Sequence, residues 1–222
     1  MQLDVLMPRL IAAGLILLIA FPVHEFAHAW TAWRLGDGTA RLFGRLTLNP
    51  LAHLDPAGAI LLVLSSVIGV GIGWAKPTPV NVNNLRGGRG AEGVVAAAGP
   101  SSNLVLAAIG AIVLRLVIEL VRQGTDVPEF VLETMLRFVE INIALLLFNF
   151  VPVPPLDGSK VLFSLMSPRA QWQYRPMLEQ YGILLLIVVA FLPLFGGQTL
   201  FGVVFERIGG PLINLLIGVD VF

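Results

Sequence analysis

An apolar segment long enough to cross a lipid bilayer lies at the start of this sequence, and it contains ionisable residues. Residues 7–33 are almost wholly apolar apart from the pentapeptide HEFAH at 24–28. A helix of about 20 residues spans the hydrocarbon core of a membrane. Positions i and i+4 share one face of a helix, so His24 and His28 can present two imidazoles to one metal ion. Ionisable groups in such a span are costly and are functional by default.

The composition extends this membrane character to the whole chain. Hydrophobic residues make up 56% and charged residues 13% of the 222 residues, and the mean hydropathy is +0.85. Soluble domains are typically about 45–50% apolar and about 25% charged, so the sequence predicts an integral, multi-pass membrane protein embedded in the lipid bilayer. With a formal net charge of zero, no nucleic acid is expected as a partner. The absence of cysteine excludes disulfides and thiolate metal sites.

Six apolar runs divide the chain, and we expect an all-α bundle of about five or six transmembrane helices. At roughly 20 residues per span, the bundle leaves no stretch for a separate soluble domain. We therefore predict a single domain over 1–222, with a catalytic core over about 7–167 and additional C-terminal spans over about 178–220. The apolar runs lie at about 7–33, 57–74, 92–121, 131–150, 180–195 and 199–219.

The second run, 57–74, is rich in glycine and is followed by Lys-Pro-Thr-Pro at 76–79, where two prolines prevent a regular helix. A plausible further metal ligand, Asp157, lies just past the end of the fourth run. For Asp157 to meet His24 and His28 at one depth, the first and fourth runs must point the same way, so one intervening run cannot cross. We expect 57–74 to be a re-entrant or half-spanning element, which is tolerated where protein or a water-filled cavity surrounds it. Six ordinary crossings are the alternative.

Positive charge is unevenly distributed under this topology. One side holds only Arg9, Arg115, Arg122 and Arg137, with Arg207 in or near the last run. The other side, which includes the end of the HEFAH segment, holds Arg34, Arg41, Arg45, Lys76, Arg86, Arg89, Lys160, Arg169 and Arg175. Because Lys and Arg favour the cytoplasmic side of membranes, we expect the site to face the cytoplasm.

Two histidines leave a catalytic zinc site one protein ligand short, since such sites usually have three. The candidates are His53 and a carboxylate. Asp157 is preferred, because it sits in a Pro-Pro-Leu-Asp-Gly turn at the end of an apolar run, a rigid break that can aim a carboxylate inward. A solvated turn or a helix-capping aspartate is the alternative. The sequence thus predicts one Zn²⁺ per chain bound by His24, His28 and Asp157, with Glu25 placed to accept a proton from a metal-bound water.

Three further polar residues are candidates for the site. Asn149 lies near the end of an apolar run, where it could polarise a scissile carbonyl, hold a substrate strand or merely cap a helix. Asn103, within the sequence GPSSN, could face the site or mark close helix packing through small residues. His53 could stabilise a transition-state oxyanion, or it could order the turn at residues 49–56.

Five segments together resemble the site-2 protease family of intramembrane zinc metalloproteases, in particular its small bacterial and archaeal type without a PDZ or CBS domain. They occur in the family's order and cover most of residues 20–160: HEFAH at 24–28, NPLAHLDPAG at 49–58, GWAKPTPVN at 73–81, AGPSSN at 98–103 and NFVPVPPLDG at 149–158. The resemblance implies that His24, His28 and Asp157 bind zinc and that Glu25 is the general base.

The resemblance also implies that Asn149 helps to bind or polarise the substrate peptide and that residues near 71–80 form a membrane-embedded edge strand. A short β strand or hairpin is therefore expected within the otherwise helical bundle, in the cell membrane of a prokaryote.

The leading functional hypothesis is an endopeptidase that cuts the transmembrane segments of other membrane proteins. A transmembrane helix hides its carbonyls in its own hydrogen bonds, so the substrate must unwind locally, and strand addition along residues 71–80 would supply replacement bonds. The alternative is a metal-binding membrane protein without proteolysis, such as a transporter or an inactive relative. A transporter would be expected to carry ionisable residues along a path through several spans, whereas here they cluster at one depth. The sequence predicts neither the natural substrate nor the oligomeric state.

Overall fold

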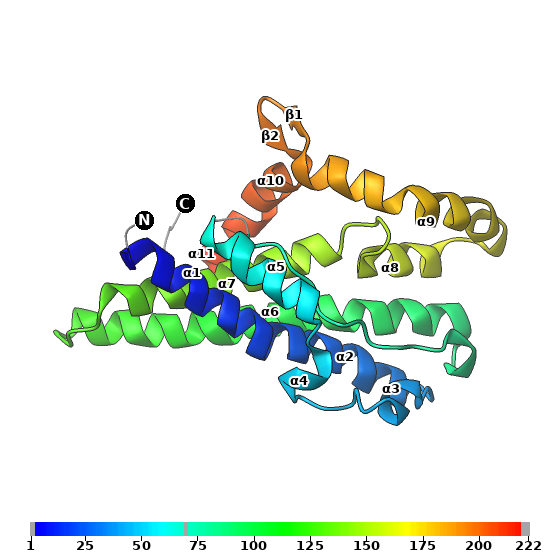
Figure 1. Ribbon diagram of the computed structural model, residues 1–222, viewed down its shortest axis with the longest axis horizontal. Coiled ribbons are helices and arrows are strands. Elements are labelled where there is room, and N and C mark those ends of the chain that lie inside the picture. Colours follow the sequence, from blue (N-terminus) through cyan, green and yellow to red (C-terminus); the bar gives the residue numbers. More distant parts are fainter. Residues whose placement is uncertain (1–2, 69–70, 219–222) are drawn as a thin grey trace.

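The chain folds almost entirely into helices (Figure 1). The computed structural model describes residues 3–68 and 71–218. Its elements are α1 (Leu3–Leu15), the π-helical segment η1 (Ile16–Ala20), α2 (Phe21–Arg34), α3 (Thr39–Leu42), α4 (Pro50–His53), α5 (Pro56–Val67), the 3₁₀ turn η2 (Val82–Asn84), α6 (Gly88–Arg122), α7 (Glu129–Asn149), α8 (Asp157–Leu165), α9 (Pro168–Phe191), β1 (Pro193–Phe195), β2 (Gln198–Thr199), α10 (Leu200–Val204), the π-helical segment η3 (Phe205–Gly209) and α11 (Gly210–Ile217).

Four of the described helical segments are long and apolar enough to cross a membrane, as expected for an all-α, polytopic membrane protein. They are Leu6–Arg34, Gly88–Arg122, Pro168–Phe191 and Leu200–Ile217. The predicted count of five or six spans is not confirmed. Helix α7 has 21 residues but carries Glu133, Arg137 and Glu140. Helix α5 has 12 residues, which make about 18 Å of helix against a hydrocarbon core of about 30 Å.

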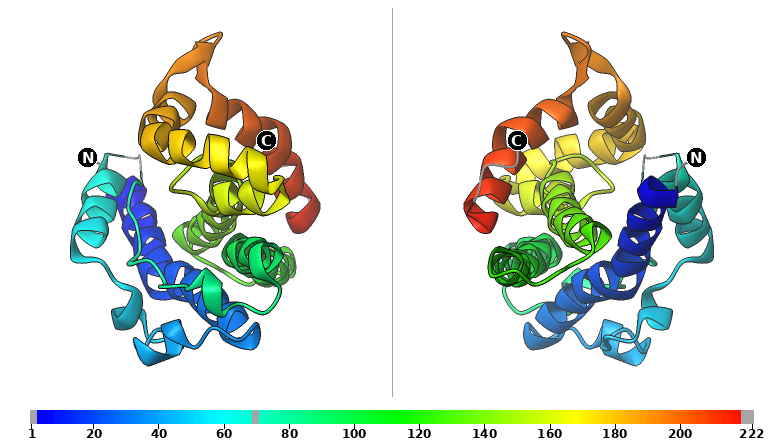
Figure 2. Two further views of the ribbon diagram at one scale, coloured as in Figure 1. Left: turned by 90° about the vertical axis from the view of Figure 1, so that its right-hand side faces the viewer. Right: turned by 90° about the vertical axis from the view of Figure 1, so that its left-hand side faces the viewer.

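Helices α6 and α7 form the centre of the molecule. A Cβ atom at Gly110 of α6 would lie 3.0 Å from the ring of Phe138 in α7, so the glycine allows the two helices to approach closely. The apolar core around this contact consists of Ala107, Ala111, Leu114, Val139, Ile143, Leu146, Ile213 and Ile217. Helices α1, α2 and α5 lie on one side of the α6–α7 pair, and α8 to α11 lie on the other (Figure 2).

The C-terminal end of α2 lies beside the N-terminal end of α6. Ala32 packs with Ala91 and Val95, and the N–H of Arg86 donates to the C=O of Leu35 at 2.7 Å. Helix α6 therefore runs antiparallel to α2, and α7 runs antiparallel to α6, so α2 and α7 point the same way. This confirms the predicted common direction of the first and fourth apolar runs, because the chain between α2 and α6 returns to the end of the bundle that it left.

Residues 71–80 run extended against α5 without pairing as a strand. The N–H of Ile72 donates to a serine hydroxyl of α5 at 2.7 Å, and the N–H of Lys76 donates to the last carbonyl of α4 at 2.8 Å. Pro77 and Pro79 have no N–H to donate. The predicted strand at this place is not confirmed, because these amides bond to helices or are missing. The two strands that the described residues do contain, β1 and β2, form an antiparallel hairpin after α9.

A buried aspartate joins the end of α2 to the segment that enters α6. Asp37 has no exposed surface. Its carboxylate accepts hydrogen bonds from the N–H of Asn81 at 2.7 Å, the side-chain amide of Asn84 at 3.0 Å and the N–H of Thr39 at 3.0 Å. Burial acts to raise the pKa of Asp37, but these hydrogen bonds, with that of the Thr39 hydroxyl, outweigh it and hold the pKa below its usual range.

The hydrogen bonds of the Asp37 carboxylate predict a pH-dependent contribution to the stability of the fold. Because the pKa of Asp37 is lower in the folded than in the unfolded chain, the carboxylate stabilises the fold fully above about pH 4, and this contribution is lost as the pH falls through the folded-state pKa. We expect Asp37→Asn to lower the free energy of unfolding at pH 7 by about 1–3 kcal/mol, the usual cost of leaving buried partners unsatisfied. Thermal unfolding in detergent at pH 7 and pH 3 tests this.

The difference between the wild type and Asp37→Asn should shrink at the lower pH. The exposed Asp126 supplies the control, since Asp126→Asn should leave the stability unchanged at both pH 7 and pH 3. A difference for Asp37→Asn that is unchanged between the two pH values would contradict the electrostatic explanation.

Candidate metal centre

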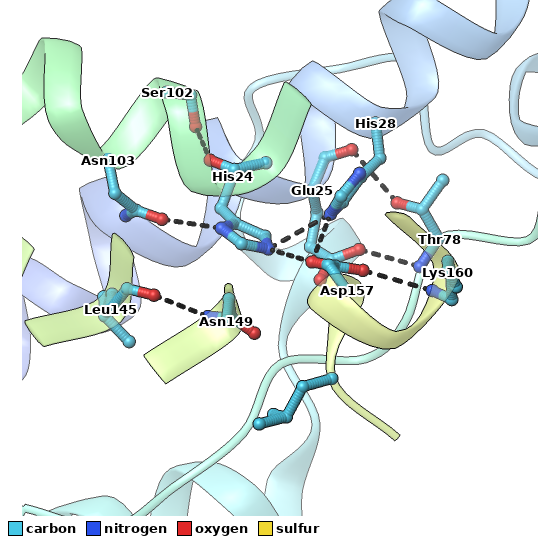
Figure 3. Close-up of polar contacts among 12 residues, drawn as sticks. His24, Glu25, His28, Thr78, Ser102, Asn103, Leu145, Asn149, Asp157 and Lys160 are labelled. Carbon is cyan, nitrogen blue, oxygen red and sulfur yellow. Dashed lines mark hydrogen bonds and ion pairs between the residues drawn. The ribbon is translucent and has the colours of Figure 1, made fainter. Parts of the chain in front are cut away.

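His24, His28 and Asp157 converge on one point (Figure 3). The Nε2 atoms of the two histidines are 3.1 Å apart, and Oδ2 of Asp157 lies 3.2 Å from Nε2 of His24 and 3.0 Å from Nε2 of His28. All three residues are buried, with exposed fractions of 8%, 6% and 7%. The structure thus brings the three predicted ligands together, and the buried position of Asp157 excludes the solvated-turn alternative.

The helical segment Leu6–Arg34 widens just before it presents the histidines. Pro22 has no N–H to donate to the carbonyl of Leu18, and residues 16–20 form a π-helical turn. Such turns occur frequently at functional sites. Regular α-helical spacing holds from Phe21 onward, so His24 and His28 lie one turn apart on the same face, with ring centroids 4.8 Å apart.

Asp157 is the first residue of α8, a position where the helix dipole favours a negative charge. Gly158 permits a tight fold here, because a Cβ atom would lie 2.5 Å from the carbonyl carbon of Phe150. The ammonium of Lys160 bonds to Oδ1 at 3.1 Å, so Oδ2 is left to the histidines. The positive charge of this ammonium favours the ionised form of the Asp157 carboxylate.

One face of α6 holds both imidazole rings. Val95, Gly99 and Asn103 are spaced four residues apart and share this face. Nδ1 of His28 lies 2.7 Å from the carbonyl oxygen of Val95, and Nδ1 of His24 lies 2.7 Å from Oδ1 of Asn103. Between these contacts, a Cβ atom at Gly99 would lie 2.6 Å from Nε2 of His24 and closer still to Nε2 of His28. Glycine therefore keeps the space beside the converging nitrogens free.

The three converging atoms fit a divalent metal ion. The carbonyl of Val95 can only accept a hydrogen bond, so Nδ1 of His28 carries the proton and Nε2 of the neutral ring has a free lone pair. That lone pair faces the charged Oδ2 of Asp157 at 3.0 Å. Two acceptors at this distance repel each other unless a cation lies between them. Two histidine nitrogens and one carboxylate oxygen are a donor set found in catalytic zinc sites, which keep the fourth position open.

The carboxylate of Glu25 lies beside the cluster and is held by the extended segment 71–80 (Figure 3). The N–H of Thr78 donates to Oε2 of Glu25 at 2.7 Å, and the Thr78 hydroxyl donates to the Glu25 carbonyl at 3.1 Å. Glu25 is 9% exposed. Its carboxylate is thus fixed by one hydrogen bond and retains lone pairs that can accept a proton.

Two other predicted residues lie outside the cluster. The side-chain amide of Asn149 donates to the carbonyl of Leu145 at 3.0 Å, which leaves one N–H and the amide oxygen for another partner. His53 is 1% exposed, and its Nε2 lies 2.8 Å from the carbonyl oxygen of Thr47. This contact agrees with the alternative that His53 orders the turn at residues 49–56. A role of His53 in stabilising an oxyanion stays a prediction.

Sequence reasoning missed two residues around the site. Thr78 lies between two prolines, which have no N–H, so its own N–H is the only backbone donor of residues 77–79. Asn142 lies in the middle of α7 and has no exposed surface. An amide inside an apolar run makes Asn149 a candidate, and the same pattern applies to Asn142.

A helical membrane protein whose HExxH helix presents two histidines and a glutamate to a buried aspartate of another helix is of the membrane zinc metalloprotease class. Sequence comparisons narrow this class to one family, because relatives named as zinc metalloproteases are 31–39% identical to the chain over most of its length. The chain belongs to the site-2 protease family.

The chain is 39% identical over 194 residues to a protein of Bacillus subtilis named "Putative zinc metalloprotease YwhC", with 85% of this chain and 83% of the relative covered. It is 32% identical over 177 residues to "Putative zinc metalloprotease Rip2" of Mycolicibacterium smegmatis, covering 79% of this chain and 65% of the relative. The protein of the same name in Mycobacterium tuberculosis H37Rv is 31% identical, with coverages of 85% and 69%. No family model and no solved structure matches the chain.

Proposed function

We propose that this protein is an intramembrane zinc metalloendopeptidase that cleaves the transmembrane segments of membrane-protein substrates. The observation that carries the proposal is the convergence of His24, His28 and Asp157 beside Glu25, with three of the four residues on a helix that is long and apolar enough to span a membrane. One zinc ion per chain would be held by the two Nε2 atoms and Oδ2. When bound, zinc acidifies a water molecule and polarises a carbonyl oxygen.

The residues of this chain supply the remaining steps. Glu25 accepts a proton from the attacking water and passes it to the leaving amine, which is the general acid–base role. The N–H of Thr78 holds the Glu25 carboxylate in place during both transfers. Asn149 uses its spare N–H to polarise the scissile carbonyl and to stabilise the negative charge that develops there.

Several features support a site within the bilayer. Helix α5 is short, and the chain between α2 and α6 starts and ends at the same end of the bundle, as expected for the predicted half-spanning element. We assign α7 as a further span. The extended segment 71–80 lies beside the site, and those of its backbone groups that do not bond to helices could pair with an unwound substrate strand. A cavity of about 330 Å³ is lined in part by Pro154, Pro155, Ser159 and Lys160, and the Lys160 ammonium bonds to Asp157, so we infer that water reaches the site from this side. The excess of Lys and Arg at this end favours a site that faces the cytoplasm.

Removal of the metal tests the proposal. We expect the purified protein in lipid nanodiscs to cleave a model transmembrane segment and to lose this activity on treatment with a chelator, because the water loses its activating ion. Stoichiometric zinc should restore cleavage, which is measured by mass spectrometry of the fragments.

The position of the cut distinguishes the hypotheses. Cleavage within the apolar part of the substrate supports the intramembrane assignment, and cleavage confined to its soluble flanks would contradict it. A protein that binds zinc but cuts none of several transmembrane segments would instead be a metal-binding protein without proteolysis.

A further inference from the structure

A chain of three hydrogen bonds, made by the buried amides of Asn103 and Asn142, connects His24 with helix α7. Asn103 and Asn142 have no exposed surface. The side-chain amide of Asn142 donates to the carbonyl of Phe138 at 2.8 Å, and the side-chain amide of Asn103 donates to Oδ1 of Asn142 at 3.1 Å. Oδ1 of Asn103 in turn lies 2.7 Å from Nδ1 of His24.

The carbonyl of Phe138 determines the direction of every bond in this chain. A backbone carbonyl only accepts, so the NH₂ group of Asn142 must face it and the Asn142 oxygen must face Asn103. Asn103 then directs its NH₂ group to that oxygen and its own oxygen to His24. An amide oxygen only accepts, so Nδ1 of His24 carries the proton and Nε2 keeps its lone pair. The ring is therefore held in the tautomer that a metal ion requires at Nε2.

We propose that Asn142 is a positioning residue for the zinc site, acting through Asn103 on the tautomer and orientation of His24. The proposal rests on the proposed role of His24 as a zinc ligand. Without Asn142, the Asn103 amide would be free to rotate by 180° and to present its NH₂ group to Nδ1. That group donates, so it would favour the tautomer with the proton on Nε2, which cannot bind zinc there. The packing of α7 against α6 thereby controls metal affinity.

The test is the zinc affinity of purified full-length variants in detergent, measured by competition with a chromophoric chelator. We expect Asn142→Leu to weaken zinc binding about 10–100-fold, the usual effect of losing an outer-shell partner. Thr134→Val is the matched control, since it also replaces a buried polar side chain of α7 and removes a hydroxyl that has no hydrogen-bond partner. Its zinc affinity should equal that of the wild type.

A rescue distinguishes tautomer control from packing. Aspartate at position 103 has no NH₂ group and can only accept from Nδ1, so it needs no partner at position 142 to set its direction. The double variant Asn103→Asp with Asn142→Leu should regain most of the affinity that Asn142→Leu loses. A loss of affinity that this double variant fails to restore would assign Asn142 a packing role and overturn the proposal, as would wild-type affinity in Asn142→Leu.

If Asn142→Leu does not fold, the Asn103 variants decide the question. Asn103→Asp should retain more zinc affinity than Asn103→Leu, and equal affinities would overturn the proposal. The His24→Ala variant tests the premise separately. If it binds zinc as tightly as the wild type, the proposed metal site is wrong, and the inference about Asn142 is overturned with it.

Discussion

The Gly99→Ala variant is expected to lose its zinc and with it all peptidase activity. The added methyl carbon would lie 2.6 Å from Nε2 of His24 and closer to Nε2 of His28, in the space beside the two nitrogens that meet the metal. The backbone of α6 cannot retreat easily, because Val95 and Asn103 on the same face are bonded to the imidazole rings. We expect the loss of zinc affinity to exceed the roughly 10–100-fold typical of outer-shell changes.

Gly90→Ala is the matched control for this substitution. Gly90 lies in the same helix, and a Cβ atom there would meet nothing within 4 Å. Alanine has the higher helix propensity, so this variant should be as stable as the wild type or slightly more so. The zinc content of both purified variants, measured by atomic spectroscopy, tests the prediction. Stoichiometric zinc in Gly99→Ala would show that the metal lies elsewhere.

The second large effect is expected for Glu25→Gln, which should keep its zinc and lose about 10²–10⁴-fold in kcat, the range typical of general acid–base catalysis. Glutamine is the same size, and its amide oxygen can still accept the hydrogen bond from Thr78. It cannot accept a proton from water. The fold and the metal site should therefore persist, while proton transfer fails.

Glu129→Gln provides the comparison, because it makes the same chemical change at an exposed position at the start of α7. Single-turnover cleavage of a transmembrane substrate should be unchanged in that variant. If Glu25→Gln cuts as fast as the wild type, Glu25 is not the base. If it loses its zinc, the effect arises from the metal site rather than from proton transfer.

Much of the site could be predicted from local patterns. Helical periodicity places His24 and His28 on one face, and the apolar length of their segment predicts a span. The preference for Asp157 over His53 followed from its rigid turn at the end of an apolar run. The common direction of α2 and α7 followed from the requirement that these ligands meet. Each of these inferences depends on spacing within one segment or on one geometric condition between two.

The predictions that the structure does not confirm, and the residues that the sequence did not reveal, concern contacts between distant segments. The extended segment 71–80 has the glycines and prolines expected of an edge strand. Its amides bond instead to α2, α4 and α5, and no local pattern in the sequence reveals these contacts. Helix α8 begins at the residue that was predicted to lie in a turn. The predicted number of spans is not confirmed by helix length and hydropathy, because α7 carries Glu133, Arg137 and Glu140.

By itself, the sequence determined that this chain is a helical membrane protein and that one helix presents two histidines and a glutamate. These properties depend on composition and on the 3.6-residue period, which are local. Only the tertiary structure decided that Gly99 leaves room beside the histidines, that Thr78 holds Glu25 and that Asn142 sets the direction of the bond to His24. Those results depend on which hydrogen-bond donors and acceptors meet across packed helices. Buried polar groups must find partners, and partners such as His24 and Asn103 lie 79 residues apart along the chain.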